Sequence, residues 1–354
     1  LRRYHDEIVA DLWRKPTTLP AVEGLFTELE QIAAKSDYRS EEAELWYDTI
    51  VAYGELISTT IVSEFLNRVG IANRWIDMRR CFRTELRHKD ATVDIEASAP
   101  LLRAEVESAP ETVFVGQGFI GGAPDGTTTT LGREGSDYSA AVVANILRAE
   151  SMSVWKDVDG ILNADPKIFA DAVKIDELNY LDTIELAYSG AQIIHPRTIK
   201  PLQNRNIPLY VRPFGDKRKP GTVIRGMSAP VDVPILILKR DQVLLTIRSR
   251  DFSFVLEERF AAIFTLMERF RLKTNLIHNS AINLGICVDN SWHVDEAIAA
   301  LREEGFDVMK IRDMELLTIR GYTPELLEKY AYGEEVFIRQ STQSTIRIVR
   351  KREA

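Results

Sequence analysis

The chain has 354 residues, of which 45% are apolar and 28% are charged, and its formal net charge at pH 7 is −8. This length and composition suit a globular protein of two domains, and the net negative charge argues against nucleic acid or a membrane surface as the main partner. The two cysteines lie far apart without metal-ligand spacing, and no apolar run approaches a membrane span, so we expect reduced thiols in a cytoplasmic protein.

Residues 1–70 are predicted to be helical, because apolar residues recur there at intervals of three and four. The longest helix is expected over Glu41–Val69, and Glu55 stands inside it among apolar neighbours such as Leu56 and Ile57. A carboxylate in apolar surroundings needs a cation, whereas one on a solvated helix face does not. The local pattern leaves both interpretations of Glu55 open.

The stretch Thr112–Glu150 combines a strand, a glycine-rich loop and a helix. The strand is predicted over Thr112–Val115, and the helix is expected to begin with Ser136 or Asp137 as its N-cap. A loop so rich in glycine is either a surface hairpin or a segment whose backbone N–H groups approach a ligand closely. Because a helix N-terminus follows, the second alternative predicts an anionic ligand.

The next segment is a predicted buried strand, Met152–Trp155, which runs directly into the acidic loop Lys156–Lys167. Strand, glycine-rich turn, helix and strand in this order predict an α/β fold with a parallel sheet. Ligands of such sheets bind at the carboxyl ends of the strands. The glycine loop and the acidic loop both fall there, which favours a site for phosphates and a metal ion.

Further along, a helix is predicted over Tyr180–Ala191 and a strand over Ile207–Arg212, and Arg225–Pro234 is expected to be a linker. His195 precedes Pro196, and we interpret it as a structural histidine rather than a base.

The pattern changes from Ile235 to the order β-α-β-β-α-β of a ferredoxin-like module. Residues 235–311 are predicted to form one complete module, and residues 315–349 a second, shorter one. We therefore expect two domains, 1–228 and 229–354, of which the second is a binding or dimerising region without catalytic residues.

Several motifs, in order, resemble those of the aspartokinases of the amino-acid kinase superfamily. Gly54–Thr59 resembles the family pattern G-E-L-x-S-T, and Gln117–Gly121 with Thr129–Asp137 resembles Q-G-F-I-G and T-T-L-G-R-G-G-S-D. Three more matches follow along the chain: Lys156–Lys167 (T-D-V-D-G-I-x-x-x-D-P-R), Glu185–Pro196 (E-L-A-x-x-G-A-K-x-x-H-P), and Ile207–Val211 with Pro220–Ile224 (I-P-x-x-V and P-G-T-x-I). The resemblance implies a three-layer αβα, carbamate-kinase-like domain with a mainly parallel sheet, followed by ferredoxin-like ACT modules.

The resemblance also implies an activity, the transfer of phosphate from ATP with Mg²⁺ to the β-carboxylate of L-aspartate. The product, 4-phospho-L-aspartate, leads towards lysine, threonine and methionine. Arg133 would hold the α-carboxylate of the substrate and Glu55 its α-ammonium group. Ser136 and Asp137 would complete the substrate pocket, with Asp137 and Arg133 as catalytic residues. The nucleotide would contact residues of the acidic loop and of the segment before His195, namely Lys156, Asp157, Leu162, Asp165, Lys167, Gln192 and Ile193. No metal ion held by protein side chains alone is expected.

The chain departs from the family pattern at several positions. Glu134 replaces a glycine, Lys156 a threonine or serine, Leu162 a tyrosine and Gln192 a lysine. Lys156 adds a positive charge and Gln192 removes one, which suggests that a single positive charge has moved from position 192 to position 156. The printed sequence lacks the opening strand K-x-G-G-T-S with its phosphate-binding lysine, and we expect roughly 60 further residues before Leu1 from the usual spacing.

Two alternatives to an aspartokinase remain at this stage. One is another amino-acid kinase, acting on glutamate or N-acetylglutamate, and the other is a non-catalytic homologue that senses amino acids. The pair Glu55 and Arg133, together with the tail, favours aspartate. The tail is expected to form a homodimer and to bind a lysine or threonine effector between Ser249–Ser253 and Thr274–Ser280. Asn275 stands there where relatives that sense lysine carry an aspartate.

Overall fold

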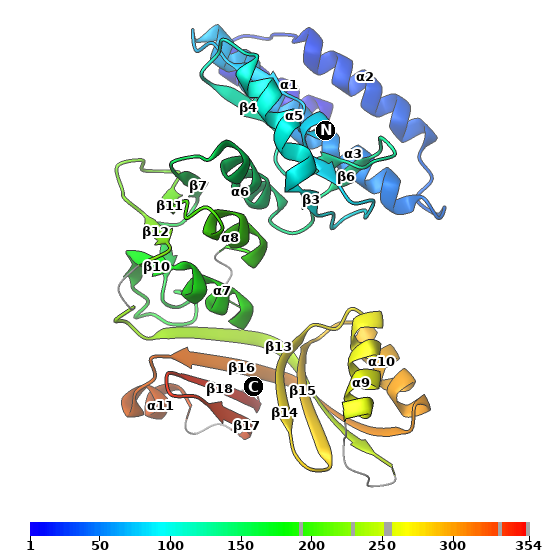
Figure 1. Ribbon diagram of the computed structural model, residues 1–354, viewed down its shortest axis with the longest axis vertical. Helices are drawn as coiled ribbons and strands as arrows, with labels where there is room; N and C mark the ends of the chain where they lie inside the picture. Colours follow the sequence, from blue (N-terminus) through cyan, green and yellow to red (C-terminus); the bar gives the residue numbers. More distant parts are fainter. Residues whose placement is uncertain (191–193, 228–230, 251–256, 332–334, 352–354) are drawn as a thin grey trace. The chain divides into compact units, whose positions relative to one another are not determined.

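The computed structural model describes residues 1–190, 194–227, 231–250, 257–331 and 335–351, and Figure 1 labels its helices and strands. They form two compact units. The first unit comprises Leu1–Asp159, Asn179–Ile184 and Ile193–Ser228, and the second comprises the remainder of the chain. The predicted division into domains at residue 228 stays a prediction.

The first unit opens with three helices, α1 (Arg2–Trp13), α2 (Pro20–Lys35) and α3 (Ala43–Arg68), as predicted. By length and composition α3 could cross a membrane, which corrects our expectation that no segment is long and apolar enough. Several of its apolar residues, Leu56 and Ile57 among them, are buried together with residues of α1 and α2 in one core cluster, whereas Val62 is 49% exposed. The packing of a core helix thus accounts for this composition.

The rest of the first unit alternates short strands and helices (Figure 1). Its strands are β1 (Arg74–Ile76), β2 (Arg83–Thr84), β3 (Val93–Asp94), β4 (Phe114–Gly116), β5 (Ile120–Gly122), β6 (Thr128–Thr130), β7 (Met152–Lys156), β11 (Leu209–Pro213) and β12 (Thr222–Arg225). Its helices are α4 (Met78–Cys81), α5 (Ile95–Glu107), α6 (Gly135–Leu147) and α8 (Pro196–Gln203). The pairs β1–β4, β2–β5 and β7–β11 are parallel, which confirms the predicted α/β class.

The glycine-rich stretch contains both a hairpin and a helix. β5 and β6 pair antiparallel, so the residues between Ile120 and Thr130 include two strands where we expected only a loop. α6 starts earlier than expected, with Glu134 as its N-cap in a left-handed conformation (φ 54°). We expected the side chain of Ser136 or Asp137 to cap the helix. Instead the backbone of Glu134 makes the turn, and the side chain of Glu134 does not cap the helix.

The second unit contains a six-stranded antiparallel sheet with the order β14-β15-β13-β16-β18-β17. Its strands are β13 (Ile235–Ser249), β14 (Thr274–Asn279), β15 (Asn283–Asp289), β16 (Phe306–Arg320), β17 (Val336–Ser341) and β18 (Thr345–Lys351). The helices α9 (Glu257–Arg269) and α10 (His293–Glu303) pack on β13, β15 and β16, and α11 (Pro324–Tyr330) packs on β16 and β18. The first predicted ferredoxin-like order is confirmed. The second module is not separate, because β13 and β16 run continuously through both.

Shorter elements complete the chain. β8 (Ile161–Leu162) and β9 (Lys174–Ile175) pair antiparallel in the second unit. β10 (Glu177–Asn179) and α7 (Tyr180–Ser189) lie where the chain passes from one unit to the other.

Candidate active site

The candidate site is built on the first turn of α6. Gly132 has a φ of 74°, and a Cβ there would lie 2.7 Å from Asp90 Oδ1, so this position requires glycine. A Cβ on Gly118 would lie 2.8 Å from the Cα of Ser136. The glycines therefore let the loop before β5 approach the N-terminus of α6, whose unpaired N–H groups favour an anion.

Arg133 lies at this helix start with an exposed side chain. Among the described residues no carboxylate forms an ion pair with it. Ser136 is exposed as well. A guanidinium group and a hydroxyl group are thus free to bind a ligand beside the positive end of the helix dipole.

Asp137 and Lys156 form an ion pair that we did not predict. The Nζ atom of Lys156, the last residue of β7, donates to Oδ2 of Asp137 on α6 at 2.9 Å. The side chain of Lys156 is 29% exposed and that of Asp137 is 19% exposed. The structure thus brings together one residue that we placed in the substrate pocket and one that we placed in the nucleotide site.

Glu55 projects from α3 and is half-buried. No cation pairs with it in the part of the chain that the structure describes, and burial raises the pKa of its carboxyl group. One turn further along α3, the hydroxyl of Thr59 accepts hydrogen bonds from Gln117 Nε2 at 2.9 Å and Trp75 Nε1 at 3.1 Å. Because Gln117 directly precedes Gly118, the turn after Glu55 lies against the glycine loop.

Two buried polar residues missed by sequence reasoning hold this loop. The fully buried carboxylate of Asp48 accepts hydrogen bonds from the backbone and hydroxyl of Thr130 and from the backbone of Lys89, and it contacts His88 Nδ1 at 2.9 Å. Gln117 is also buried, and its Oε1 accepts from the backbone N–H of Met78. The sequence signal of Asp48 is a polar residue within an apolar pattern, and Gln117 is the first residue of the motif Gln117–Gly121, from which we assigned it no role.

The predicted nucleotide-binding residues divide between the units. Asp157 is exposed in the first unit, directly after β7. Leu162, Asp165 and Lys167 belong to the second unit, where Asp165 Oδ1 accepts from the backbone N–H of Lys167 at 2.9 Å. Gln192 and Ile193 lie outside the described residues. His195 is the N-cap of α8, and its Nδ1 accepts from the backbone N–H of Arg197, in agreement with a structural role.

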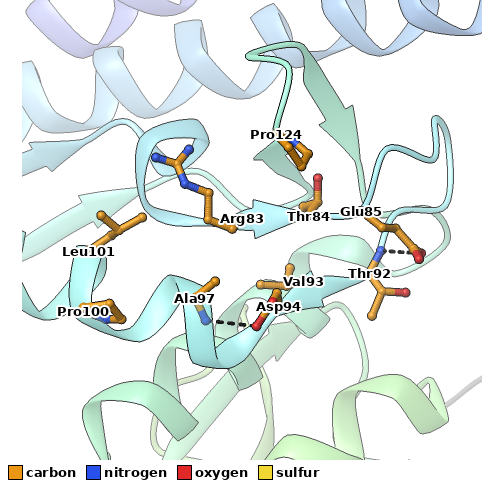
Figure 2. A pocket seen from close by; sticks show the side chains of 10 residues that line it. All are labelled: Arg83, Thr84, Glu85, Thr92, Val93, Asp94, Ala97, Pro100, Leu101 and Pro124. Atoms are coloured by element: carbon orange, nitrogen blue, oxygen red, sulfur yellow. Dashed lines mark hydrogen bonds between the residues drawn. The ribbon is translucent and has the colours of Figure 1, made fainter.

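Two of the cavities in the described part of the first unit differ in their lining. One, of about 770 Å³, is lined by β2, β3 and the start of α5 (Figure 2). Its carboxylates are already occupied, since Asp94 accepts from Ala97 N and Glu85 from Thr92 N. The other, of about 470 Å³, has a mainly apolar lining from β4, α5, α6 and Met152, and it also reaches Ser136.

Comparison with known proteins gives a consistent picture. The model of the amino acid kinase family matches residues 12–213. The chain is 36% identical over 250 residues to the lysine-sensitive aspartokinase 3 of Escherichia coli, an alignment that covers 69% of this chain and 55% of that protein. It is 30% identical over 282 residues to aspartokinase 1 of Arabidopsis thaliana, covering 75% of this chain and 47% of that protein.

The similarity in structure covers more of the chain than the similarity in sequence. The crystal structure of E. coli aspartokinase III in complex with aspartate and ADP superposes with a TM-score of 0.78 at 27% identity, covering 93% of this chain and 77% of that one. In sequence, the chain spans about half the length of the two curated relatives described above. Since the family model matches more than half of the chain, this protein belongs to the amino acid kinase family.

Proposed function

We propose that this protein is an aspartokinase, which transfers the γ-phosphoryl group of ATP to the β-carboxylate of L-aspartate. The observation that carries the proposal is the exposed guanidinium of Arg133, which pairs with no carboxylate of the described residues, at the N-terminus of the helix α6 that also carries Asp137 and its partner Lys156. The likeness to a structure that holds aspartate and ADP supports the choice of substrate and nucleotide.

In this proposal the substrate is held by its two charged ends. The planar fork of Arg133 suits the α-carboxylate, because it can form two parallel hydrogen bonds. Glu55 takes the α-ammonium group, which supplies the cation that its carboxylate lacks. Ser136 adds a hydroxyl donor, and Asp137 orients a lysine ammonium group.

The nucleotide lies at the carboxyl end of β7. Lys156 brings a positive charge there, and the other proposed contacts are Asp157, Leu162, Asp165, Lys167, Gln192 and Ile193. When bound, Mg²⁺ neutralises phosphate charge as the two anionic reactants meet. Among the described residues no three His, Cys, Asp or Glu side chains are close enough to hold a metal ion. In kinases Mg²⁺ is usually bound through one or two carboxylates and the phosphates of the substrate.

A strand of the family type K-x-G-G-T-S would supply the lysine at the transferring phosphate. We propose that such a strand occupies the apolar cavity of about 470 Å³ beside α6. Among the described strands, β4 pairs only with β1 and β7 only with β11, so each has an unpaired edge. Phe114, Val143 and Met152 line the cavity, as expected around a central strand that is buried on both faces.

We further propose a kinase domain over residues 1–228 and an ACT-like regulatory region over residues 229–354. The regulatory region would mediate homodimer formation and respond to lysine or threonine, and the protein would act in the cytoplasm. A lysine-sensitive relative supports an amino-acid effector.

The experiment is a hydroxylamine trap for acyl phosphate, with Mg-ATP and the intact protein. L-Aspartate should give a hydroxamate, and L-glutamate and N-acetyl-L-glutamate should not. Trapping with one of the glutamates alone would assign another amino-acid kinase. Aspartate binding in calorimetry without any hydroxamate would assign the amino-acid sensor.

A further inference from the structure

Arg133 is flanked on both sides by residues that are fastened to α8. On its C-terminal side, Oε2 of Glu134 accepts a hydrogen bond from the backbone N–H of His195 at 2.8 Å. On its N-terminal side, Nη1 of Arg197 donates to the carbonyl oxygen of Leu131 at 3.1 Å. The segment that carries Arg133 is thus attached to the start of α8 at two points.

Arg197 contributes more than one contact. Its guanidinium also donates to Asp90 Oδ1 at 2.7 Å and to the carbonyl oxygen of Ala91 at 2.8 Å, and it lies 4.7 Å from the ring centroid of Tyr138. Asp90 fills the space beside Gly132 that a Cβ would need. One half-buried arginine therefore joins α8, the turn around Asp90 and the residue two positions before Arg133.

Glu134 adopts a backbone conformation that favours glycine. Its φ and ψ are 54° and 30°, a left-handed geometry uncommon for a residue with a long side chain. The family pattern described above has glycine at this position. A conformation of this kind persists where the surrounding structure fixes it, and here the carboxylate of Glu134 spans 61 residues of sequence to reach His195.

We propose that Glu134 and Arg197 are positioning residues that fix the backbone on either side of Arg133 and so aim its guanidinium at the substrate. This inference rests on the proposed role of Arg133 in aspartate binding. Neither residue needs to touch the substrate. Their effect is to fix the backbone from which the exposed side chain of Arg133 projects before the ligand arrives, which reduces the ordering cost of binding.

The test compares variants that separate the contact from the backbone strain. Glu134→Gly relieves the left-handed conformation but loses the contact to His195, whereas Glu134→Gln keeps an acceptor oxygen. Glu134→Gly should raise the KM for aspartate about tenfold, the typical effect of one hydrogen bond to a charged group. It should leave the KM for ATP within about twofold and the melting temperature equal or higher.

Glu134→Gln should restore most of the aspartate KM, because its amide oxygen can still accept from His195. Arg197→Lys keeps the charge but loses the fork, so it should raise the aspartate KM by less than Arg197→Met. Arg218→Met removes an exposed arginine of the same unit that pairs with Asp216 at 3.0 Å, and it should match the wild type. A wild-type aspartate KM in Glu134→Gly would overturn the proposal.

A second measurement does not depend on activity. The backbone amide of His195 and those of residues 131–135 should exchange hydrogen faster in Glu134→Gly than in the wild type, and unchanged exchange would overturn the attachment. If the wild type neither binds nor phosphorylates aspartate, the proposed function fails while amide exchange still decides whether Glu134 holds this segment.

Discussion

Replacing Lys156 with methionine is a direct test of the candidate site, because it removes the charge and keeps an unbranched side chain. The substitution leaves the carboxylate of Asp137 without its partner at 2.9 Å. We expect a moderate loss of stability and a loss of ATP affinity of similar size, for separate reasons.

The loss of stability follows from the geometry of the pair. At 2.9 Å the attraction of two unit charges is about 6 kcal/mol at an effective dielectric constant of 20 and about 1.4 kcal/mol in water. The side chains are partly exposed, and desolvation offsets much of the attraction. The N-terminus of α6 also continues to stabilise the carboxylate of Asp137. We therefore expect a net loss of about 1–2 kcal/mol, or a few degrees in melting temperature.

The loss of ATP affinity follows from the position of the charge at the carboxyl end of β7. Asp137 already neutralises part of it, so we expect roughly a tenfold rise in the KM for ATP rather than the full effect of an unpaired cation. The assay is hydroxamate formation at saturating aspartate, together with thermal unfolding of the free protein.

A matched control is Arg3→Met on α1. Arg3 pairs with Glu7 at the same 2.9 Å, but the two side chains are 92% and 61% exposed. Exposed pairs of this kind contribute about 0.3–0.5 kcal/mol, so the control should change the stability by less than Lys156→Met and leave the KM for ATP unaltered. If Lys156→Met and Arg3→Met behave alike in both assays, the Asp137–Lys156 pair is not part of the active site.

Four further predictions concern the proposed roles. Arg133→Lys should leave the melting temperature unchanged, since the side chain is exposed, but raise the aspartate KM more than tenfold in steady-state kinetics. Burial raises the pKa of Glu55, so its carboxyl group keeps its proton to higher pH in the native state than in the unfolded chain. The native state therefore loses stability as the pH rises from the pKa of the unfolded chain through that of the native state. Glu55→Gln should flatten the pH dependence of the melting temperature and weaken aspartate binding. Lys156→Thr should weaken ATP binding, and adding Gln192→Lys should recover it only if the two charges substitute for each other. Truncation near Ala229 should abolish inhibition by lysine or threonine in activity titrations, and equal inhibition of both forms would place the effector in the kinase domain.

Much of the site could be anticipated because it depends on local signals. Glycines before a helix and an acidic loop after a strand are short-range patterns. The single parallel sheet that we expected to carry both loops is divided, because the described strands β4 and β7 belong to separate sheets. Asp137 on α6 nevertheless meets Lys156 at the end of β7. Their ion pair was nevertheless missed, because the direction of a side chain depends on packing that local patterns do not encode.

The contacts that hold the loop lie beyond such patterns. Asp48 contacts Thr130 across 82 residues of sequence, and Arg197 contacts Leu131 across 66. Asp48 and Arg197 are each the centre of a small polar network, and the partners in each network come from different elements. A polar residue in an apolar pattern shows that some partner is needed, and the tertiary fold decides which partner it is.

The long strands of the second unit show another limit. We ended the first module at residue 311 and began the second at residue 315, which divides β16 into two strands; Asp313 lies between them. The structure continues the strand through this point with a positive φ of 60° at Asp313, and β13 does the same with 53° at Asp241. The register of β13 against β16 shifts between Lys239 and Leu244. A bulge in each strand thus produces the sequence signal of a break without ending the sheet.

Lys239 and Gln242, between which the register of β13 shifts, are also partners of Asn275, the residue that we compared with an effector-binding aspartate. Its side chain is 2% exposed, and its amide nitrogen donates to Gln242 Oε1 and Asp289 Oδ1, each at 2.8 Å. Its amide oxygen accepts from the ammonium group of Lys239 at 2.8 Å. An effector amine that approached the amide oxygen of Asn275 would meet the ammonium group of this chain's own lysine there. Specificity for an effector at this position therefore depends on Lys239 as much as on the neutral amide that Asn275 carries in place of an aspartate. The two residues are 36 positions apart in sequence. A comparison of single motifs does not detect such an internal competitor, since only the folded sheet brings Lys239 of β13 to Asn275 of β14.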